Sequence, residues 1–423
     1  MNNGKTTNQY MITKSPQLDM RHVFYLLALG IYMSYSILGV SFYQSAIGNS
    51  GLTILKLCFA LLVVAELTDF SYRQSDLLGI IGIALIMLVT YNIMENVWWR
   101  PLLWIAVFMF GARHIPFKKI AKFALIVSVI WFAFIVLSSK AGIIPDYLDT
   151  TTHPGVTRHY LGFLYCLFPP TLLFNIEALY IYLRKDKIKW FELLICLVVA
   201  YIFYKYCDAR LNFMLNGLMI VGAGVVRYRG RMPKKFKNMC RHISKCLPWI
   251  FIVCALISVI LSFGYTPHLS WMEKINSALG GRLKMGKLAF QRYGLSAWGQ
   301  NIEMRGNGLR ADGTRGRSEY FYIDCLYVRF LQEYGIIFSV IMLALLTIAM
   351  YRMWQKRKYL LLIILSVLAL HAVVDDLILL PYYNIFWIVL SYFIFPTKSS
   401  EYSNKKITNY FFLKKKARKA RSV

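Results

Sequence analysis

Charged side chains are scarce in this chain of 423 residues, and acidic ones are scarcer than basic ones, with 20 Asp and Glu against 49 Lys and Arg. Only 16% of the residues are charged, while 58% are hydrophobic. Soluble chains are about 25% charged and about 45–50% apolar. The shortage of charge therefore excludes a cytosolic globular enzyme, a disulfide-stapled secreted domain and a disordered protein.

Cysteine pairs and metal-ligand motifs are also missing. None of the eight cysteines belongs to a Cys-x-x-Cys pair. Most lie inside apolar runs, where Cys behaves as a small hydrophobic residue. Cys240 and Cys246 flank a basic segment, but no His/Cys set with zinc spacing accompanies them. We therefore expect no metal, no disulfide and no cofactor.

Long apolar runs make up most of the chain. A membrane span needs about 20 apolar residues, and it must be helical because lipid offers the backbone no hydrogen-bond partners. The sequence therefore predicts an all-α polytopic membrane protein with about 12 transmembrane helices. We predict spans at residues 23–44, 52–70, 77–94, 100–112, 121–140, 158–182, 189–206, 211–227, 247–265, 335–352, 359–374 and 382–396.

Lysine and arginine collect in alternate segments between these runs. Residues 184–189 and 227–245 are strongly basic, whereas 45–51 and 141–157 contain no Lys or Arg. Basic residues mark the cytoplasmic side of a membrane protein, so we predict that both termini are cytoplasmic. The same rule accounts for the net charge of +29 without nucleic acid as a partner.

This alternation divides the chain into five parts. They are a cytoplasmic N-tail (1–22), nine transmembrane helices (23–265), an extracytoplasmic loop (266–334), three further transmembrane helices (335–396) and a basic cytoplasmic C-tail (397–423). We expect the C-tail to lie against anionic membrane lipid. The large loop breaks the charge rule because it is external and yet rich in Lys and Arg. A basic external loop suggests an anionic ligand at the outer membrane face.

Three arginines lie at the predicted outer ends of spans. Arg158 opens the sixth span, Arg210 lies in the turn between the seventh and eighth, and Arg282 lies just beyond the ninth. Each has a simple explanation, since an arginine at a span end can snorkel to the interface and Asp208 can pair with Arg210. Together they could hold a pyrophosphate, because the planar guanidinium group binds phosphate oxygens bidentately.

The eleventh span ends in three further ionisable residues, His371, Asp375 and Asp376. His371 and Asp375 are four residues apart, so they share one face of a helix. A histidine, or a carboxylate whose pKa is raised by burial, could take the proton from an attacking hydroxyl. A hydrogen bond that only packs the helix is the simpler interpretation, and the sequence alone does not choose the base among the three.

Four ordered motifs cover residues 158–384, about half of the chain. They are Arg158-His159-Tyr160-Leu161-Gly162-Phe163, then Tyr206-Cys207-Asp208-Ala209-Arg210, then Leu279-Gly280-Gly281-Arg282-Leu283 with Tyr293-Gly294-Leu295 and Trp298-Gly299-Gln300, and last Ile323-Asp324 with Tyr334-Gly335, His371-Ala372-Val373-Val374-Asp375-Asp376 and Tyr383-Asn384. With the topology, they resemble the Wzy-type polymerases of O-antigen, capsule and exopolysaccharide, relatives of the O-antigen ligases. The sequence departs from that family at Ala209, where serine is usual, and after Phe163, where a polar turn is usual.

The resemblance implies an inverting glycosyl transfer at the outer face of a bacterial cytoplasmic membrane. The donor would be a growing glycan on undecaprenyl pyrophosphate, and the acceptor would be a hydroxyl of a lipid-linked repeat unit. The family pattern assigns pyrophosphate binding to the three arginines named above. It makes His371 the acceptor base or a residue that orients it, with Asp375 or Asp376 holding the imidazole. The related ligases need no metal, and a chain-length regulator and a flippase are expected partners.

Two other interpretations stay open. A ligase would move finished glycan from the same donor to another acceptor. A flippase or another transporter would more often carry its charges near the bilayer midplane and show internal repeats, whereas the charges here bunch at one face. The first outer loop, 41–51, contains no acidic residue, which argues against the other large class of membrane glycosyltransferases. Lys274 lies in the large loop outside any motif, so we expect it to be dispensable.

Overall fold

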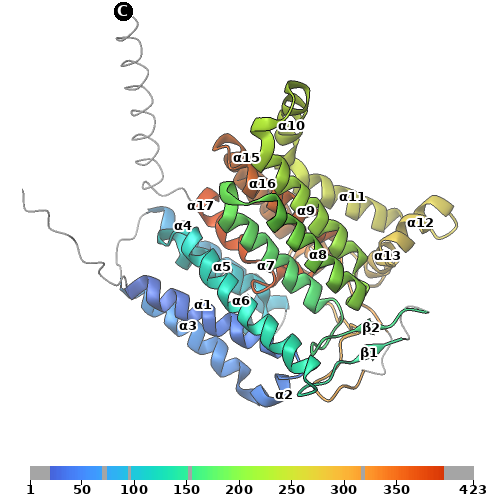
Figure 1. Ribbon diagram of the computed structural model, residues 1–423. Coiled ribbons are helices and arrows are strands. Elements are labelled where there is room, and N and C mark those ends of the chain that lie inside the picture. The colour runs from blue at the N-terminus through green and yellow to red at the C-terminus, as the bar shows by residue number, and fades with distance from the viewer. Residues whose placement is uncertain (1–19, 69–73, 94–96, 151–154, 316–319, 395–423) are drawn as a thin grey trace, which may run out of the picture.

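The computed structural model describes residues 20–68, 74–93, 97–150, 155–315 and 320–394. Within these ranges the chain forms a bundle of helices, many of them running side by side (Figure 1). Most of the predicted N-tail and the whole predicted C-tail, 397–423, lie outside the described residues.

The helices follow one another along the chain, with long connections between α6 and α7 and between α13 and α14. The first part contains α1 (Met20–Gly39), α2 (Gln44–Ile47), α3 (Gly51–Leu67), α4 (Gln74–Ile93), α5 (Pro101–Gly111) and α6 (Phe117–Lys140). The middle part contains α7 (Phe168–Arg184), α8 (Trp190–Cys207), α9 (Arg210–Tyr228), α10 (Lys234–Cys246), α11 (Ile250–Gly264), α12 (Ser270–Ala278) and α13 (Arg282–Tyr293). The last part contains α14 (Leu326–Arg329), α15 (Gly335–Gln355), α16 (Tyr359–Val374) and α17 (Ser391–Ile394).

Seven helical runs in the described chain are long and apolar enough to cross a membrane. They are Met20–Gly39, Gln44–Leu67, Phe117–Lys140, Trp190–Cys207, Arg210–Arg231, Lys234–Gly264 and Leu326–Gln355. Shorter apolar helices lie at Gly79–Tyr91, Pro101–His114, Tyr359–Val374 and Ile385–Ile394. These helices agree with the predicted class, a helical membrane protein, while the number of about 12 spans stays a prediction.

The sixth predicted span is wrong at its start. Residues Arg158–His159 form strand β2, which pairs antiparallel with β1 (Leu148–Asp149). Helix α7 begins only at Phe168, and Pro169 and Pro170 lie in its first turn, where the backbone N–H that proline lacks would have no helical partner. Arg158 therefore lies in a hairpin ahead of the helix, not inside a span.

Segments that we predicted to be external lie toward one end of the bundle. In Figure 1 the hairpin β1–β2 lies at the lower right and helix α13 lies above it at the right, whereas the basic helix α10 lies at the top. Helix α13 packs on α11. The large loop therefore begins with two helices, α12 and α13, of which α13 covers the bundle.

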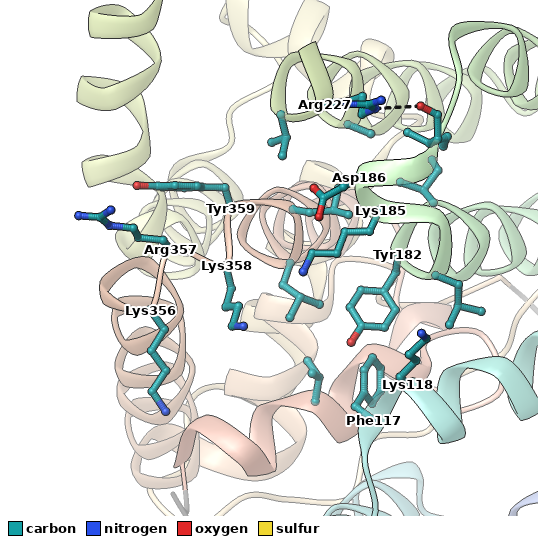
Figure 2. A pocket seen from close by; sticks show the side chains of 18 of the residues that line it. Phe117, Lys118, Tyr182, Lys185, Asp186, Arg227, Lys356, Arg357, Lys358 and Tyr359 are labelled. Atoms are coloured by element: carbon teal, nitrogen blue, oxygen red, sulfur yellow. Dashed lines mark hydrogen bonds between the residues drawn. The ribbon is translucent and has the colours of Figure 1, made fainter. Parts of the chain in front are cut away.

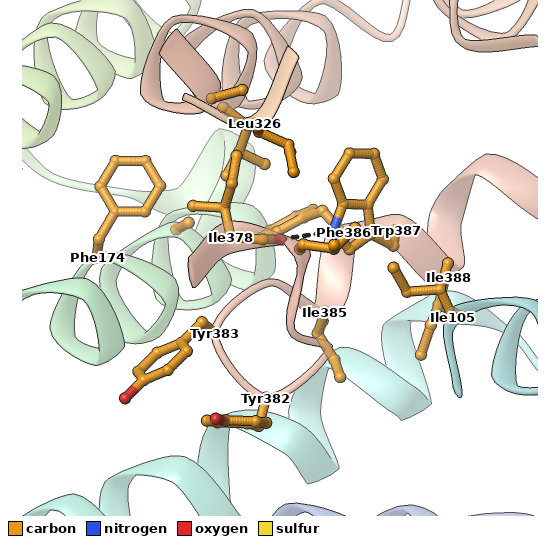
Figure 3. Packing of buried hydrophobic residues seen from close by; sticks show 14 of the residues in the cluster. Ile105, Phe174, Leu326, Ile378, Tyr382, Tyr383, Ile385, Phe386, Trp387 and Ile388 are labelled. Atoms are coloured by element: carbon orange, nitrogen blue, oxygen red, sulfur yellow. Dashed lines mark hydrogen bonds between the residues drawn. The ribbon is translucent and has the colours of Figure 1, made fainter. Parts of the chain in front are cut away.

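The segment after α16 is irregular but deeply buried. A 3-10 helix over Ile385–Leu390 leads into α17, and all six of its residues are buried. Its turn is held by side chains: the Trp387 indole donates to the Ile378 carbonyl at 2.6 Å (Figure 3). The Asn384 side chain accepts from the Phe386 amide at 3.1 Å. Irregular backbone is tolerated at membrane depth where protein surrounds it. This packing fixes the residues that directly follow α16.

Candidate functional site

A cavity of about 850 Å³ opens among the hairpin, the α8–α9 turn, the α12–α13 turn and the end of α16. Arg158, Arg210, Arg282 and Asp375 all line it, although they are spread over more than half of the chain. Four of the six residues that we predicted as site residues are therefore brought together in space. The remaining two, His371 and Asp376, are buried and do not line the cavity.

Arg282 is positioned by the two glycines before it. Gly280 and Gly281 adopt φ angles of +64° and +86°, a left-handed conformation that costs a residue with a Cβ about 1–2 kcal/mol. This turn starts α13 at Arg282 and folds its side chain back. Its Nη1 donates to the Leu279 carbonyl at 2.7 Å, and its Nε donates to the carbonyl of Val374. The guanidinium group is thus pinned between α13 and the end of α16.

Gly280→Ala is expected to disturb this guanidinium group. A Cβ at Gly280 would lie 2.6 Å from Arg282 Nη1, in addition to the cost of the left-handed backbone. Misplacing a charged group by about 1 Å can cost up to a hundredfold in rate. We expect a loss of about tenfold or more in the glycan synthesis that the family resemblance implies, measured as polymer formed per unit of membrane protein. Gly142→Ala is the control, because Gly142 has φ +74° with open space around it, and it should keep near-normal synthesis.

Arg158 is held by the hairpin and by the α8–α9 turn. It is buried, and it lies opposite Asp149 in the register of the two strands. Its Nε donates to the Cys207 carbonyl at 3.1 Å. Arg315 ties the large loop to the same hairpin, since its Nη2 donates at 2.7 Å both to Asp149 and to the Tyr160 hydroxyl. The motif arginine is therefore fixed from three separate segments of the chain.

The Leu-Gly-Phe that follows has a structural role. Leu161 and Gly162 both have positive φ angles, 52° and 84°. A Cβ at Gly162 would lie 2.7 Å from the Ile144 side chain, so only glycine fits this close approach. Phe163 then bridges to Ser41 in the first outer segment. The motif shapes the wall that carries Arg158.

Arg210 begins α9 directly after the turn. Asp208 takes a left-handed conformation with φ +49°, and Arg210 donates from Nε to its carboxylate at 3.1 Å. The side chain of Arg210 is 65% exposed, in contrast to the buried Arg158. Arg210 therefore keeps freedom to turn toward a ligand in the cavity.

Asp375 and His371 form the predicted pair, but only Asp375 reaches the cavity. The two side chains lie 3.6 Å apart, from His371 Nε2 to Asp375 Oδ2. Asp375 also accepts from the Thr171 hydroxyl at 3.3 Å and from the Leu377 amide at 3.0 Å. His371 is fully buried against Phe174, with ring centroids 5.0 Å apart. The imidazole therefore lies behind the carboxylate and is out of reach of a substrate in the cavity.

Asp376 points into a buried chain of charges. It contacts Arg329, and the Tyr322 hydroxyl donates to it at 2.9 Å. Arg329 donates to Glu333 at 2.9 Å, and Glu333 contacts Arg100, the residue directly before α5. Removing one member of a buried ion pair costs about 3–5 kcal/mol, so this chain ties the large loop to the bundle.

Asp324 is a cavity residue to which our sequence analysis gave no role. It lines the same space as Asp375, and the Tyr320 hydroxyl donates to it at 3.3 Å. Burial raises the pKa of Asp324 to about 6, although the Arg282 charge pulls that pKa down. The only sequence signal was its place in the Ile323-Asp324 motif. A carboxylate with such a pKa suits proton transfer near neutral pH.

Lys274, which we expected to be dispensable, also lines the cavity. Helix α12 carries it on an exposed face beside Ser277, which also lines the cavity. Lys274 therefore lies closer to the candidate site than its lack of a motif suggested, and its dispensability stays a prediction. Lys284, on an exposed position of α13 outside the lining, is the better control for loop charge.

The cavity thus combines cations that can hold a phosphate group with carboxylates that can accept a proton. In the part of the chain that the structure describes, no group of three or more His, Cys, Asp and Glu side chains is arranged to hold a metal ion. Comparison with protein-family models, with curated proteins and with solved structures finds no match for this chain.

Proposed function

We propose that this protein polymerises oligosaccharide repeat units carried on undecaprenyl pyrophosphate, as the resemblance to the Wzy-type polymerases suggests. The reaction would be an inverting, metal-independent glycosyl transfer at the outer face of a bacterial cytoplasmic membrane. One observation carries the proposal: three arginines from three separate segments line one cavity together with the carboxylates of Asp208, Asp324 and Asp375.

In this proposal the acceptor hydroxyl of one lipid-linked repeat unit attacks the anomeric carbon of the glycan on the donor lipid. A bond forms between the acceptor oxygen and that carbon, and the bond from the carbon to the pyrophosphate oxygen breaks. The pyrophosphate leaves on its lipid with the bonding electron pair. Arg158, Arg210 and Arg282 stabilise the charge that develops on it, which is worth about 10²–10³ in rate for one well-aimed donor.

The acceptor proton passes to a cavity carboxylate. Asp324 is the better base, because burial raises its pKa to about 6 and so makes it a stronger proton acceptor than an ordinary aspartate. Asp375 is held by Thr171 and by the Leu377 amide, so its carboxylate is fixed in orientation. We assign Asp375 to positioning the acceptor hydroxyl, with His371 packed behind it.

The position of the cavity supports a reaction on a membrane-bound substrate. Arg282 contacts the carbonyl of Val374, the last residue of α16, and Arg210 is the first residue of α9. A pyrophosphate linked to a membrane lipid lies at the level of such helix ends. A transporter would more often carry these charges near the bilayer midplane. A ligase would use the same donor, so the two enzymes differ only in the acceptor.

The experiment is a comparison of surface glycan and lipid-linked intermediates in source cells with and without this protein. Cells that lack it should keep single repeat units on the outer leaflet and lose the ladder of longer chains. Reintroducing the wild-type protein should restore the ladder.

Two other outcomes would contradict the proposal. Repeat units that pile up on the cytoplasmic leaflet would mean that the protein moves them across the membrane. Full-length lipid-linked polymer that fails to reach its final acceptor would mean that it is a ligase.

A further inference from the structure

A second cavity, of about 620 Å³, lies at the opposite end of the bundle (Figure 2). Arg210 and Arg227 lie at the two ends of α9 and line one cavity each. At about 1.5 Å per residue, the 17 steps between them span about 26 Å, close to the hydrocarbon thickness of a bilayer. The second cavity therefore has no part in the reaction proposed above.

Basic side chains from four separate segments line this second cavity. Its lining includes Lys118, Lys185, Arg227, Lys356, Arg357 and Lys358. Asp186 is the carboxylate among its described lining residues. In Figure 2, Lys185 and Lys358 reach into the same space, with Tyr182 and Phe117 nearby. The positive-inside rule accounts for many basic residues at this end, but it does not explain why Lys185 and Lys358 point into the same cavity.

The close approach of these lysines causes charge repulsion, which a bound anion would offset. Burial lowers the pKa of Lys358, and the charges of Lys185 and Lys356 lower it further. Lys185 and Arg357 also hold positive φ angles of 41° and 54°, in a region that favours glycine. Among the described residues, Leu161 and Asp208 are the other non-glycine residues with positive φ; Asp208 lines the candidate active site, and Leu161 follows Arg158, which lines it too. Backbone strain of this kind clusters at binding sites.

An apolar groove of about 480 Å³ adjoins the basic cavity. Val226 and Tyr359 line both, so the two spaces share a wall. The groove runs between α9, α10 and α16, and its outer edge is open, since the Val221 side chain is 63% exposed. A basic hollow beside an open apolar groove matches a molecule with an anionic head and a long apolar tail.

We propose that this pair of spaces is a binding site for an anionic phospholipid, with its phosphate in the basic cavity and an acyl chain in the groove. The lipid would bridge α7, α9, α15 and α16 at the end of the bundle away from the candidate active site. This proposal does not depend on the polymerase reaction.

The test is binding of phosphatidylglycerol to the purified full-length protein in detergent, followed by native mass spectrometry. Wild type should retain phosphatidylglycerol and not phosphatidylcholine. Each lysine near a lipid phosphate contributes about fivefold in affinity. The double variant Lys185→Ala/Lys358→Ala should therefore bind about twenty-fivefold more weakly. The charge-preserving pair Lys185→Arg/Lys358→Arg should bind like wild type, which shows that the fold tolerates both changes.

The matched control is Lys119→Ala/Lys187→Ala, which removes two exposed lysines from the same end of the bundle but outside the lining. This pair should bind phosphatidylglycerol like wild type. An equal loss in this control would overturn the proposal in favour of general surface charge. Glycerol phosphate, tested as a competitor, separates the two phosphate sources: displacement of the lipid at equal concentration would mean a site for free phosphate, and no lipid site.

Discussion

Cells carrying Arg282→Ala are expected to lose long-chain glycan while the protein accumulates in the membrane. Arg282 is pinned by backbone carbonyls at both sides of the cavity, so its guanidinium group is already oriented before a substrate binds. Loss of one such preorganised donor to a developing negative charge costs about 10²–10³ in rate. The measurement is the ladder of surface glycan on a gel, together with polymer formed by purified protein from lipid-linked repeat units.

Two variants sharpen this test. Lys284→Ala removes a positive charge from the same helix outside the cavity, and it should leave the ladder near normal. Arg282→Lys keeps the charge but loses the bidentate fork, so we expect an intermediate rate. Equal losses in Arg282→Ala and Lys284→Ala would mean that the total charge of the loop matters and not the placed guanidinium group.

Asp324→Asn is expected to abolish the proton-transfer step, with a loss of about 10²–10⁴ in rate. The base must be deprotonated to act, so wild-type activity should rise with pH and level off above the pKa of Asp324, which is about 6. At one pH unit below that pKa, about a tenth of the base is ionised. The measurement is the initial rate of polymer formation between pH 4.5 and 8 by purified protein.

The pH profile also separates Asp324 from the other candidate bases. The Arg282 charge lowers the pKa of Asp324, so its removal in Arg282→Gln should move the acid limb of the residual activity to higher pH. His371→Ala should keep an acid limb near 6, because the imidazole is buried behind Asp375. An acid limb that survives in Asp324→Asn and vanishes in His371→Ala would make the imidazole the base.

Hydropathy was sufficient to predict the class of this protein, a helical membrane protein, while the orientation that the charge alternation predicts stays a prediction. A lipid-facing helix must be apolar along its own length, so each span can be recognised from one continuous stretch of sequence. The same pattern indicated the motif arginines, because a charged residue at the end of an apolar run is unusual. The prediction failed at Arg158: the eight apolar and aromatic residues 160–167 after the strand look like part of the helix, but they form turns.

Only the tertiary structure decided which ionisable groups share a space. Asp324 and Arg282 are 42 residues apart in sequence, and both line the cavity with Asp375 because glycine turns and buried packing after α16 bring their segments together. The helical spacing of His371 and Asp375 predicted their pairing, yet it could not tell which of the two faces the cavity. A four-residue spacing specifies the neighbours on one helix, whereas burial depends on the helices packed against it. For the same reason the sequence could not show that Lys274, which belongs to no motif, lines the cavity. The charge rule explains each basic residue of the second cavity separately, but only the packing of the helix ends brings these residues to one space.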